Sequence, residues 1–301
     1  MPAKSISRKV ERKVLAVETP EGDGVIVRRS IGSQQLRNLT PFLMLDHFRI
    51  GKGAGFPDHP HRGQATVTYM LEGVGQHEDS AGHAGTIETG GVQWMCAGKG
   101  IIHAEMPMRT DEGVDPVGLQ LWIDLPKQYK MVDPSYQELG PAEIPIAQPE
   151  TGVRVKVISG TSHGVTSPVR PLGGCWYFHV MLDTKGKKIF QDLPAGWTTF
   201  LYIFKGSVLV GDNPIPQPTF HTVVLSNGSD ETGVMIDAAE DDTQFILISG
   251  EPLDQTVVQH GPFVMTTREE IQRTLMDYSM GVNGFEKAHS WKSEIGKQRR
   301  R

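Results

Sequence analysis

The amino-acid sequence predicts an all-β protein with two domains, each a sandwich or a barrel of short strands. Thirty-four glycines and twenty prolines divide the 301 residues into short apolar runs, a pattern typical of strands joined by turns. The chain is about twice as long as a typical single domain. A proline-rich stretch near the midpoint and a weak internal repeat also favour a division into two domains.

The predicted strands are runs rich in β-branched and aromatic residues. In the first half they include residues 64–71 and the segment that begins at Ile101 and Ile102. Six further runs follow in the second half: Val153–Ile158, Trp176–Leu182, Thr199–Phe204, Ser207–Val210, His221–Leu225 and Thr243–Ile248.

The stretch Glu138–Gly152 carries three prolines near the middle of the chain. Domain boundaries fall preferentially in segments of this composition. We therefore expect an N-terminal domain over residues 1–140, a linker over residues 141–152 and a C-terminal domain over residues 153–301.

Two short echoes suggest that the domains are related copies. Tyr69–Gly73 and Tyr202–Gly206 both contain an aromatic residue, two apolar residues, a charge and a turn glycine. Leu121–Pro126 and Leu247–Pro252 form a second pair with nearly the same separation. Repeats at a fixed spacing indicate duplicated structural units.

A single helix is predicted near the C-terminus. Thr267–Glu270 has the sequence of a capping box, in which the threonine hydroxyl and the glutamate each satisfy a backbone amide. Ile271, Leu275 and Tyr278 form an apolar stripe that we expect to pack against the β-structure, and Gly281 is placed to end the helix.

Composition excludes several classes of protein. No apolar run approaches the ~20 residues needed to cross a bilayer. The two cysteines, Cys96 and Cys175, supply neither a disulfide framework nor a cysteine-based zinc site, which favours a reducing intracellular location. A net charge of −5 argues against direct binding of nucleic acid. We expect a protein of the cytoplasm, the nucleus or both, without a membrane partner.

Two pairs of metal-ligand residues are the main functional signal. His59 and His61 are two residues apart, and so are His103 and Glu105. On a β-strand this spacing points both side chains to the same face, so two neighbouring strands could enclose one ion. Pro60 fits the start or the edge of a sheet. Three imidazoles and a carboxylate suit a first-row transition metal rather than calcium.

The second half lacks these ligands. Counting back from the repeated glycine places Asp192 where the first half has His59, and Pro194 where it has His61. The sequence therefore predicts one metal per chain, in the N-terminal domain.

Longer motifs around the ligand pairs resemble the pirin family. They are His59–Gly63, Gln93–Trp94 leading into Ala97–Pro107, and Gly261–Met265, and the similarity extends from Leu43–Phe48 to Trp291–Gly296. Pirins belong to the cupin superfamily. The resemblance implies two cupin-type β-barrels (a bicupin) with a short C-terminal helix, and one iron, Fe2+ or Fe3+, bound by His59, His61, His103 and Glu105, with other divalent transition metals as alternatives.

The sequence departs from related patterns at three positions. Thr66 stands where the wider cupin pattern has a glutamate after its histidine pair, so the carboxylate is expected from Glu105. Cys96 and Lys99 stand where we expect threonine and arginine in relatives. Neither Cys96 nor Lys99 removes a ligand, so these two substitutions affect only the surroundings of the metal.

The resemblance implies two kinds of function. The first is a quercetinase, a metal-dependent flavonol 2,3-dioxygenase that consumes O2 and releases carbon monoxide. In such an enzyme Glu105 would be either the catalytic base for the flavonol hydroxyl or a fixed ligand. The candidates for an apolar wall around the substrate are Phe48, Phe56, Met70, Trp94 and Met106, and a place in the plain hydrophobic core is the commoner role for each residue of this kind.

The second is an iron- and redox-dependent nuclear coregulator of transcription that binds a transcription factor, or a modulator that binds a metabolic enzyme. A change of iron charge would then alter docking at the surrounding surface. Arg62 and Lys99 are candidates for that surface. A third alternative is a zinc-dependent cupin of the sugar-isomerase kind, which would consume no O2.

Overall fold

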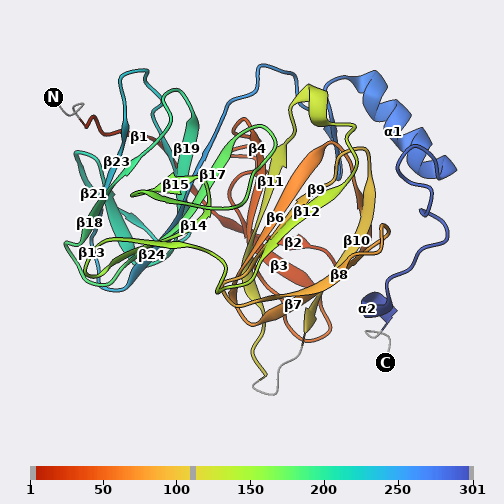
Figure 1. The fold of residues 1–301 in the computed structure, drawn as a ribbon, viewed down its shortest axis with the longest axis horizontal. Coiled ribbons are helices and arrows are strands. Elements are labelled where there is room, and N and C mark those ends of the chain that lie inside the picture. The colour runs from red at the N-terminus through yellow and green to blue at the C-terminus, as the bar shows by residue number, and fades with distance from the viewer. Residues whose placement is uncertain (1–4, 109–112, 298–301) are drawn as a thin grey trace. The chain divides into compact units, whose positions relative to one another are not determined.

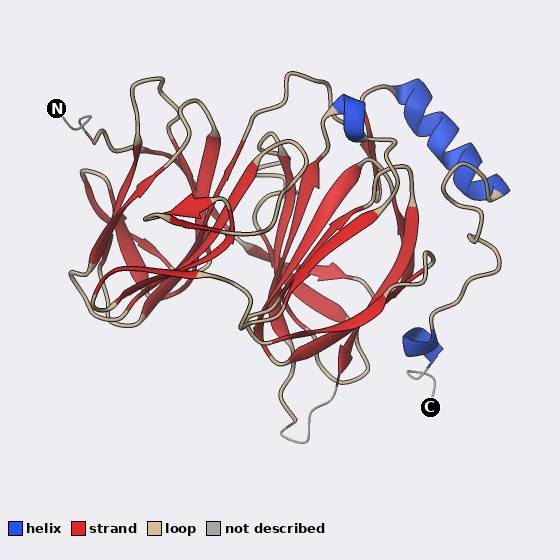
Figure 2. Cartoon of the chain, viewed as in Figure 1, coloured by secondary structure: helices blue, strands red, loops and turns tan. Residues whose placement is uncertain are grey.

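The computed structural model describes residues 5–108 and 113–297. Strands account for most of its secondary structure (Figure 2). The chain forms two compact units, and each is assembled from separate parts of the sequence (Figure 1). Unit 1 consists of Met1–Ala16, Ser30–Pro41 and Ala142–Pro252, and unit 2 consists of Val17–Arg29, Phe42–Pro141 and Leu253–Arg301.

Unit 1 contains two antiparallel sheets and a short hairpin. The seven-stranded sheet has the order β1 (Val10–Leu15), β22 (His221–Leu225), β19 (Thr198–Lys205), β24 (Thr243–Gly250), β17 (Cys175–Leu182), β14 (Val153–Ser159) and β13 (Ile146–Glu150). The four-stranded sheet has the order β18 (Lys188–Asp192), β23 (Gly233–Ala238), β20 (Ser207–Val210) and β21 (Asn213–Pro218). The hairpin pairs β15 (Thr161–Ser162) with β16 (Val165–Thr166).

The core of unit 1 lies between its two sheets. Alternate residues of β14, such as Val153, Val155 and Val157, are completely buried and share one apolar cluster with Val234 and Ile236 of β23. This alternation follows from the two-residue period of a strand. The interior of unit 1 is therefore closed by apolar side chains.

Unit 2 repeats the same plan. Its seven-stranded sheet has the order β12 (Ser135–Leu139), β9 (Val92–Cys96), β6 (Gln64–Glu72), β11 (Val117–Asp124), β4 (Phe42–Arg49), β3 (Val25–Arg29) and β2 (Val17–Glu21). Its four-stranded sheet has the order β5 (Phe56–His61), β10 (Ile101–Met108), β7 (Val74–Asp79) and β8 (Ala84–Glu88). Three helical segments and a hairpin complete it: η1 (Lys127–Tyr129), α1 (Arg268–Met280), α2 (Glu294–Lys297), and β25 (Val258–His260) paired with β26 (Phe263–Met265).

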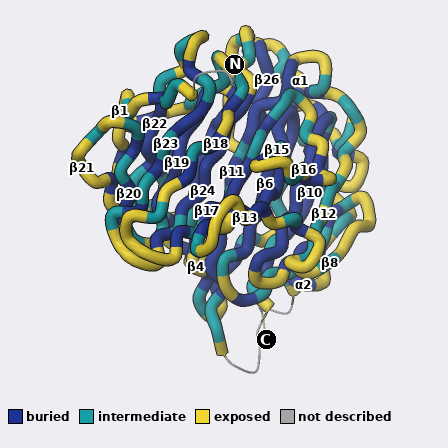
Figure 3. The backbone as a smooth tube through the Cα atoms, turned by 60° about the vertical axis from the view of Figure 1, so that its left-hand side comes forward, coloured by how far each residue is buried: buried dark blue, intermediate teal, exposed yellow. Residues whose placement is uncertain are grey.

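The C-terminal segment of unit 2, residues 253–297, covers the outer face of β10. Ile102 packs with Phe263, Ile271 and other residues of this segment, and Ala104 and Met106 pack with Ile295 of α2. Because the side chains of β10 alternate, this packing directs His103 and Glu105 to the opposite face. Figure 3 shows the buried central strands and their exposed connections.

The predicted strands are confirmed. Each of the six runs in the second half lies in a strand of unit 1, and residues 64–71 lie in β6. The internal repeat is confirmed as well, because Gly73 and Gly206 both have positive φ and both connect a seven-stranded sheet to a four-stranded one. Glycine adopts this backbone conformation without the strain that a Cβ atom would cause.

The two ends of the predicted helix are confirmed, but the predicted apolar stripe is partly wrong. Thr267 and Glu270 form the expected capping box, and Gly281 ends α1 in the left-handed conformation. Ile271 is buried, but Leu275 is 37% exposed, and Thr274 and Asp277 are buried instead. These two polar residues are buried because they contact Arg62, a partner distant in sequence.

The two units differ from the contiguous domains expected from sequence. The first strand, β1, pairs with β22 and belongs to unit 1, whereas Leu253–Arg301, with α1, belongs to unit 2. The expected linker over residues 141–152 contains β13, which pairs with β14. Each end of the chain thus completes the unit formed by the other half, a long-range pairing that local composition does not encode. No helix in the described part of the chain combines the length and apolar character of a membrane span.

Candidate metal centre

The two histidine-bearing strands are direct neighbours in unit 2. Strand β5 pairs antiparallel with β10, and His59 lies opposite His103 in this register. His61 is two residues further along β5 and points to the same face as His59. Sequence spacing predicted this arrangement, and the strand pairing brings all three imidazoles together.

The three imidazoles converge closely. One ring nitrogen from each of His59, His61 and His103 lies within 4.8 Å of the others. The Nε2 atoms of His59 and His103 are 3.0 Å apart, and the ring centroids of the three pairs are 4.4–4.9 Å apart. This is the only group of three such ligand residues among the described parts of the chain. Three nitrogen donors aimed at one point can hold a transition-metal ion.

The surroundings keep His61 and His103 uncharged, which metal binding requires. Burial, with His59 as a second cause, lowers the pKa of His61 and of His103 well below the usual value for histidine. The carbonyl oxygen of Pro57 is 2.8 Å from Nδ1 of His59 and can accept its proton, which leaves Nε2 as the donor to a metal.

A buried glutamine beside His61 provides a separate test of whether this site suits a metal ion. Gln64 is completely buried, and its Nε2 lies 2.8 Å from Nδ1 of His61. Its Oε1 is buried and has no hydrogen-bond partner. If the amide is turned, Oε1 accepts the Nδ1 proton, which is the arrangement found beside metal-bound histidines. Sequence reasoning missed Gln64, although its position three residues after His61 was a usable signal.

Glu105 does not join the histidine group. Its carboxylate accepts a hydrogen bond of 2.8 Å from Thr68 Oγ1 and two bonds, of 3.1 and 3.3 Å, from Gln120 Nε2. The register of β10 against β5 shifts after His103, so Glu105 lies opposite Phe56. The shift carries Glu105 along the strand, toward two donors that the β6–β11 pairing places side by side. Neither donor was predicted from sequence.

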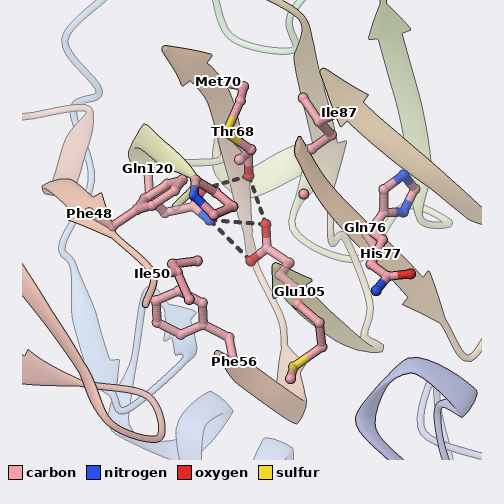
Figure 4. Close-up of a pocket in the computed structure, with 13 residues that line it drawn as sticks. Phe48, Ile50, Phe56, Thr68, Met70, Gln76, His77, Ile87, Glu105 and Gln120 are labelled. Carbon is pink, nitrogen blue, oxygen red and sulfur yellow. Dashed lines mark hydrogen bonds between the residues drawn. The ribbon is translucent and has the colours of Figure 1, made fainter. Parts of the chain in front are cut away.

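A pocket in unit 2 has the Glu105 carboxylate in its wall (Figure 4). Four of the five residues predicted for an apolar wall line it: Phe48, Phe56, Met70 and Met106. Ile50 and Ile87 add to this wall, whereas Trp94 is buried elsewhere. The polar part consists of Thr68, Gln76, His77 and Gln120 besides Glu105. The free volume is about 20 Å3, room for one water-sized molecule.

The candidate docking residue Arg62 is not on the surface. Its side chain is 1% exposed and forms an ion pair of 2.8 Å with Asp277 of α1. The prediction of Arg62 as a docking residue is therefore wrong, because its charge is fully used inside the protein. The side chain of Lys99 is 42% exposed and pairs with Asp133.

Comparisons with known proteins show to which family the chain belongs. The Pirin family model matches residues 24–123, and the model of the Pirin C-terminal cupin domain matches residues 177–284. The chain belongs to the pirin family. Pirin-like protein 2 of Arabidopsis thaliana is 47% identical over 96% of this chain and 89% of its own length. Pirin of Homo sapiens is 47% identical over 96% of this chain and 99% of its own length.

A solved structure extends the pirin comparison. A quercetin 2,3-dioxygenase from Acinetobacter baumannii aligns with a TM-score of 0.83 and 31% sequence identity, over 91% of this chain and 98% of the other. The two units of this pirin are therefore its two cupin barrels, as the sequence predicted. The histidine group lies in unit 2, the barrel that contains most of the N-terminal half.

Proposed function

We propose that this pirin is an iron-dependent flavonol 2,3-dioxygenase that opens quercetin with O2 and releases carbon monoxide. The observation that carries the proposal is the group of three imidazoles in the same barrel as a pocket with apolar walls and a carboxylate. The likeness to a quercetin 2,3-dioxygenase supports the choice of reaction. Iron held by His59, His61 and His103, with Glu105 as the proposed fourth ligand, would supply Lewis acidity and one-electron chemistry toward O2.

The residues of the pocket would bind and orient the flavonol. Phe48, Phe56 and Met70 offer apolar surface for a flat aromatic ring. Because the pocket is small, we expect Met70, an adaptable side chain in its wall, to move when the ring enters. Burial of the ring would exclude water from the place where the bond is broken.

Glu105 would take the proton from the substrate hydroxyl. Thr68 and Gln120 hold its carboxylate in the pocket wall and leave it other lone pairs for a substrate proton. A positioned base of this kind contributes about 10^2–10^4-fold to rate. The same side chain is on the His103 face of β10, so the proposal gives Glu105 both roles, as ligand and as base.

The test uses protein loaded anaerobically with Fe2+ and then mixed with quercetin and O2. We expect O2 uptake, bleaching of the flavonol and carbon monoxide in equal amounts, and none of these from zinc-loaded protein. Fully iron-loaded protein that bleaches no quercetin would contradict the proposal. A coregulator would instead bind its partner differently in the Fe2+ and Fe3+ forms, and a sugar isomerase would act with zinc and without O2.

A further inference from the structure

The three residues that follow His61 are held by segments distant in sequence. Arg62 donates to Asp277 and Thr274 of α1 and to the carbonyl of Asn283. The ring of Phe285 lies 4.6 Å below its guanidinium carbon. A buried arginine with this many partners is fixed in position. The end of β5 is therefore anchored to the C-terminal segment.

Gly63 allows this segment to approach closely. It has a φ of +77°, and a Cβ atom there would lie 1.9 Å from the carbonyl oxygen of Val264. Its own amide donates to Gly98, and its carbonyl accepts from the buried ammonium of Lys130. Only glycine fits this position, because both the conformation and the space exclude a side chain.

Gln64 connects the same C-terminal segment to a metal-binding histidine. Its Nε2 lies 3.1 Å from the carbonyl oxygen of Pro262 and 2.8 Å from Nδ1 of His61. An amide nitrogen carries two hydrogens, so it can donate to both acceptors at once. In that arrangement Nδ1 of His61 is unprotonated, the proton of the neutral ring is on Nε2, and neither nitrogen is available to a metal.

The opposite arrangement leaves Nε2 of His61 free for a metal. A half-turn of the Gln64 amide exchanges Nε2 and Oε1, and Oε1 then accepts the Nδ1 proton of His61. Oε1 is buried and has no partner in the first arrangement. The half-turn gives Oε1 the Nδ1 proton but places Nε2 where Oε1 had no partner, so we expect the turn only when the bond between His61 and the metal compensates for it. The carbonyl of Pro262 would lose one donor and keep the longer bond of 3.4 Å from the Arg62 amide.

We propose that Gln64 is a positioning residue that turns its amide when metal enters, and so fixes His61 in its metal-binding form. The inference rests on the metal centre of the proposed function, but it does not depend on the reaction. It assigns a role to the Arg62-Gly63-Gln64 run, which holds the glutamine between His61 and the turn at Pro262.

Three variants test this role through zinc affinity, measured by competition with a chelator. Gln64→Met keeps the volume but removes both polar atoms, and we expect zinc to bind about 10–100-fold more weakly, as when the partner of a metal-bound histidine is lost. Gln64→Glu keeps an acceptor for the Nδ1 proton, and we expect an affinity near that of the unmodified chain. Gln93→Met is the matched control, because Gln93 is equally buried in unit 2 but donates to Glu138.

Nitrogen NMR of 15N-histidine protein gives an independent measure. We expect the proton of His61 on Nε2 in the metal-free chain and on Nδ1 in the zinc-loaded chain. A Gln64→Met affinity equal to that of the unmodified chain, equal losses in Gln64→Met and Gln93→Met, or zinc-loaded protein without a proton on Nδ1 would each overturn the inference. If the unmodified chain takes up no zinc, the inference fails together with the metal centre; failure of quercetin turnover alone leaves it intact.

Discussion

Strand β18 of unit 1 has the position in its four-stranded sheet that β5 has in unit 2, and β23 corresponds in the same way to β10. In unit 2 this pair of strands carries the three histidines. In unit 1 the matching pair buries Ile189, Val234 and Ile236 in a continuous apolar core. One strand arrangement is thus filled in two ways. Unit 1 uses its interior for packing, and unit 2 uses the equivalent interior for polar groups.

The difference shows what a functional interior costs. Apolar burial contributes roughly 25 cal/mol per Å2, whereas a buried polar group adds stability only when it is hydrogen-bonded. The buried imidazoles of His61 and His103 give unit 2 a site in place of apolar packing. The C-terminal segment supplies packing on the outer face of β10, so the strand that carries ligands is stabilised from outside.

The largest expected effect is on metal content, which we expect to depend on a histidine of unit 2 and not on one of unit 1. His61→Ala removes one of three nitrogen donors, so we expect the chain to lose its metal. His179→Ala, at a buried histidine of unit 1, is the control and should retain one metal per chain. Elemental analysis after dialysis measures both. If the His61→Ala protein keeps one metal per chain, the proposal that the histidines of unit 2 bind the metal is wrong.

The next effect concerns Glu105. Glu105→Gln preserves the shape but removes the base, and we expect turnover of quercetin to fall by about 10^2–10^4-fold. Metal content of the same protein decides its other role, because loss of iron identifies Glu105 as a ligand and retention as a base alone. Glu88→Gln, the same change at an exposed carboxylate of β8 that does not line the pocket, is the control. Unchanged turnover in Glu105→Gln would remove Glu105 from the reaction.

Sequence predicted those features that depend on neighbours along the chain. The strands of unit 1, the capping box at Thr267 and the histidine pair on β5 all follow from local residue types and from the two-residue period of a strand. The absence of a histidine pair from the matching strand of unit 1 could be predicted because the repeat aligned Asp192 with His59 and Pro194 with His61.

Features that depend on long-range pairing could not be predicted. The exchange of chain ends between the units rests on β1 pairing with β22 and on α1 contacting Arg62. The orientation of Glu105 depends on donors from β6 and β11 that meet only in the folded sheet. Arg62 looked like a surface charge because its partner, Asp277, is more than two hundred residues away.

A smaller effect tests the packed interior of unit 1. Phe178 is completely buried in the apolar cluster, and Phe178→Ala should lower the free energy of unfolding by about 3–5 kcal/mol. Metal content should not change, because His59, His61 and His103 all lie in unit 2. Phe204→Ala, at a half-buried position on β19, should cost less. Urea unfolding measures both, and an equal cost for the two variants would contradict a tightly packed core.

The smallest effect is a pH dependence that arises from unit 1. Burial, with Lys156 and Arg154 as further causes, lowers the pKa of His179 to about 3. An unfolded chain takes up the proton near pH 6.5, whereas the folded chain does not until about pH 3, so stability falls as the pH is lowered through this interval. The contribution is at most about 1.4 kcal/mol per pH unit. We expect His179→Gln to unfold in urea with a weaker pH dependence between pH 6.5 and 5. If the free energy of unfolding changes with pH equally in the two proteins, His179 takes up its proton at the same pH in the folded and in the unfolded chain. Burial in unit 1 would then not lower its pKa.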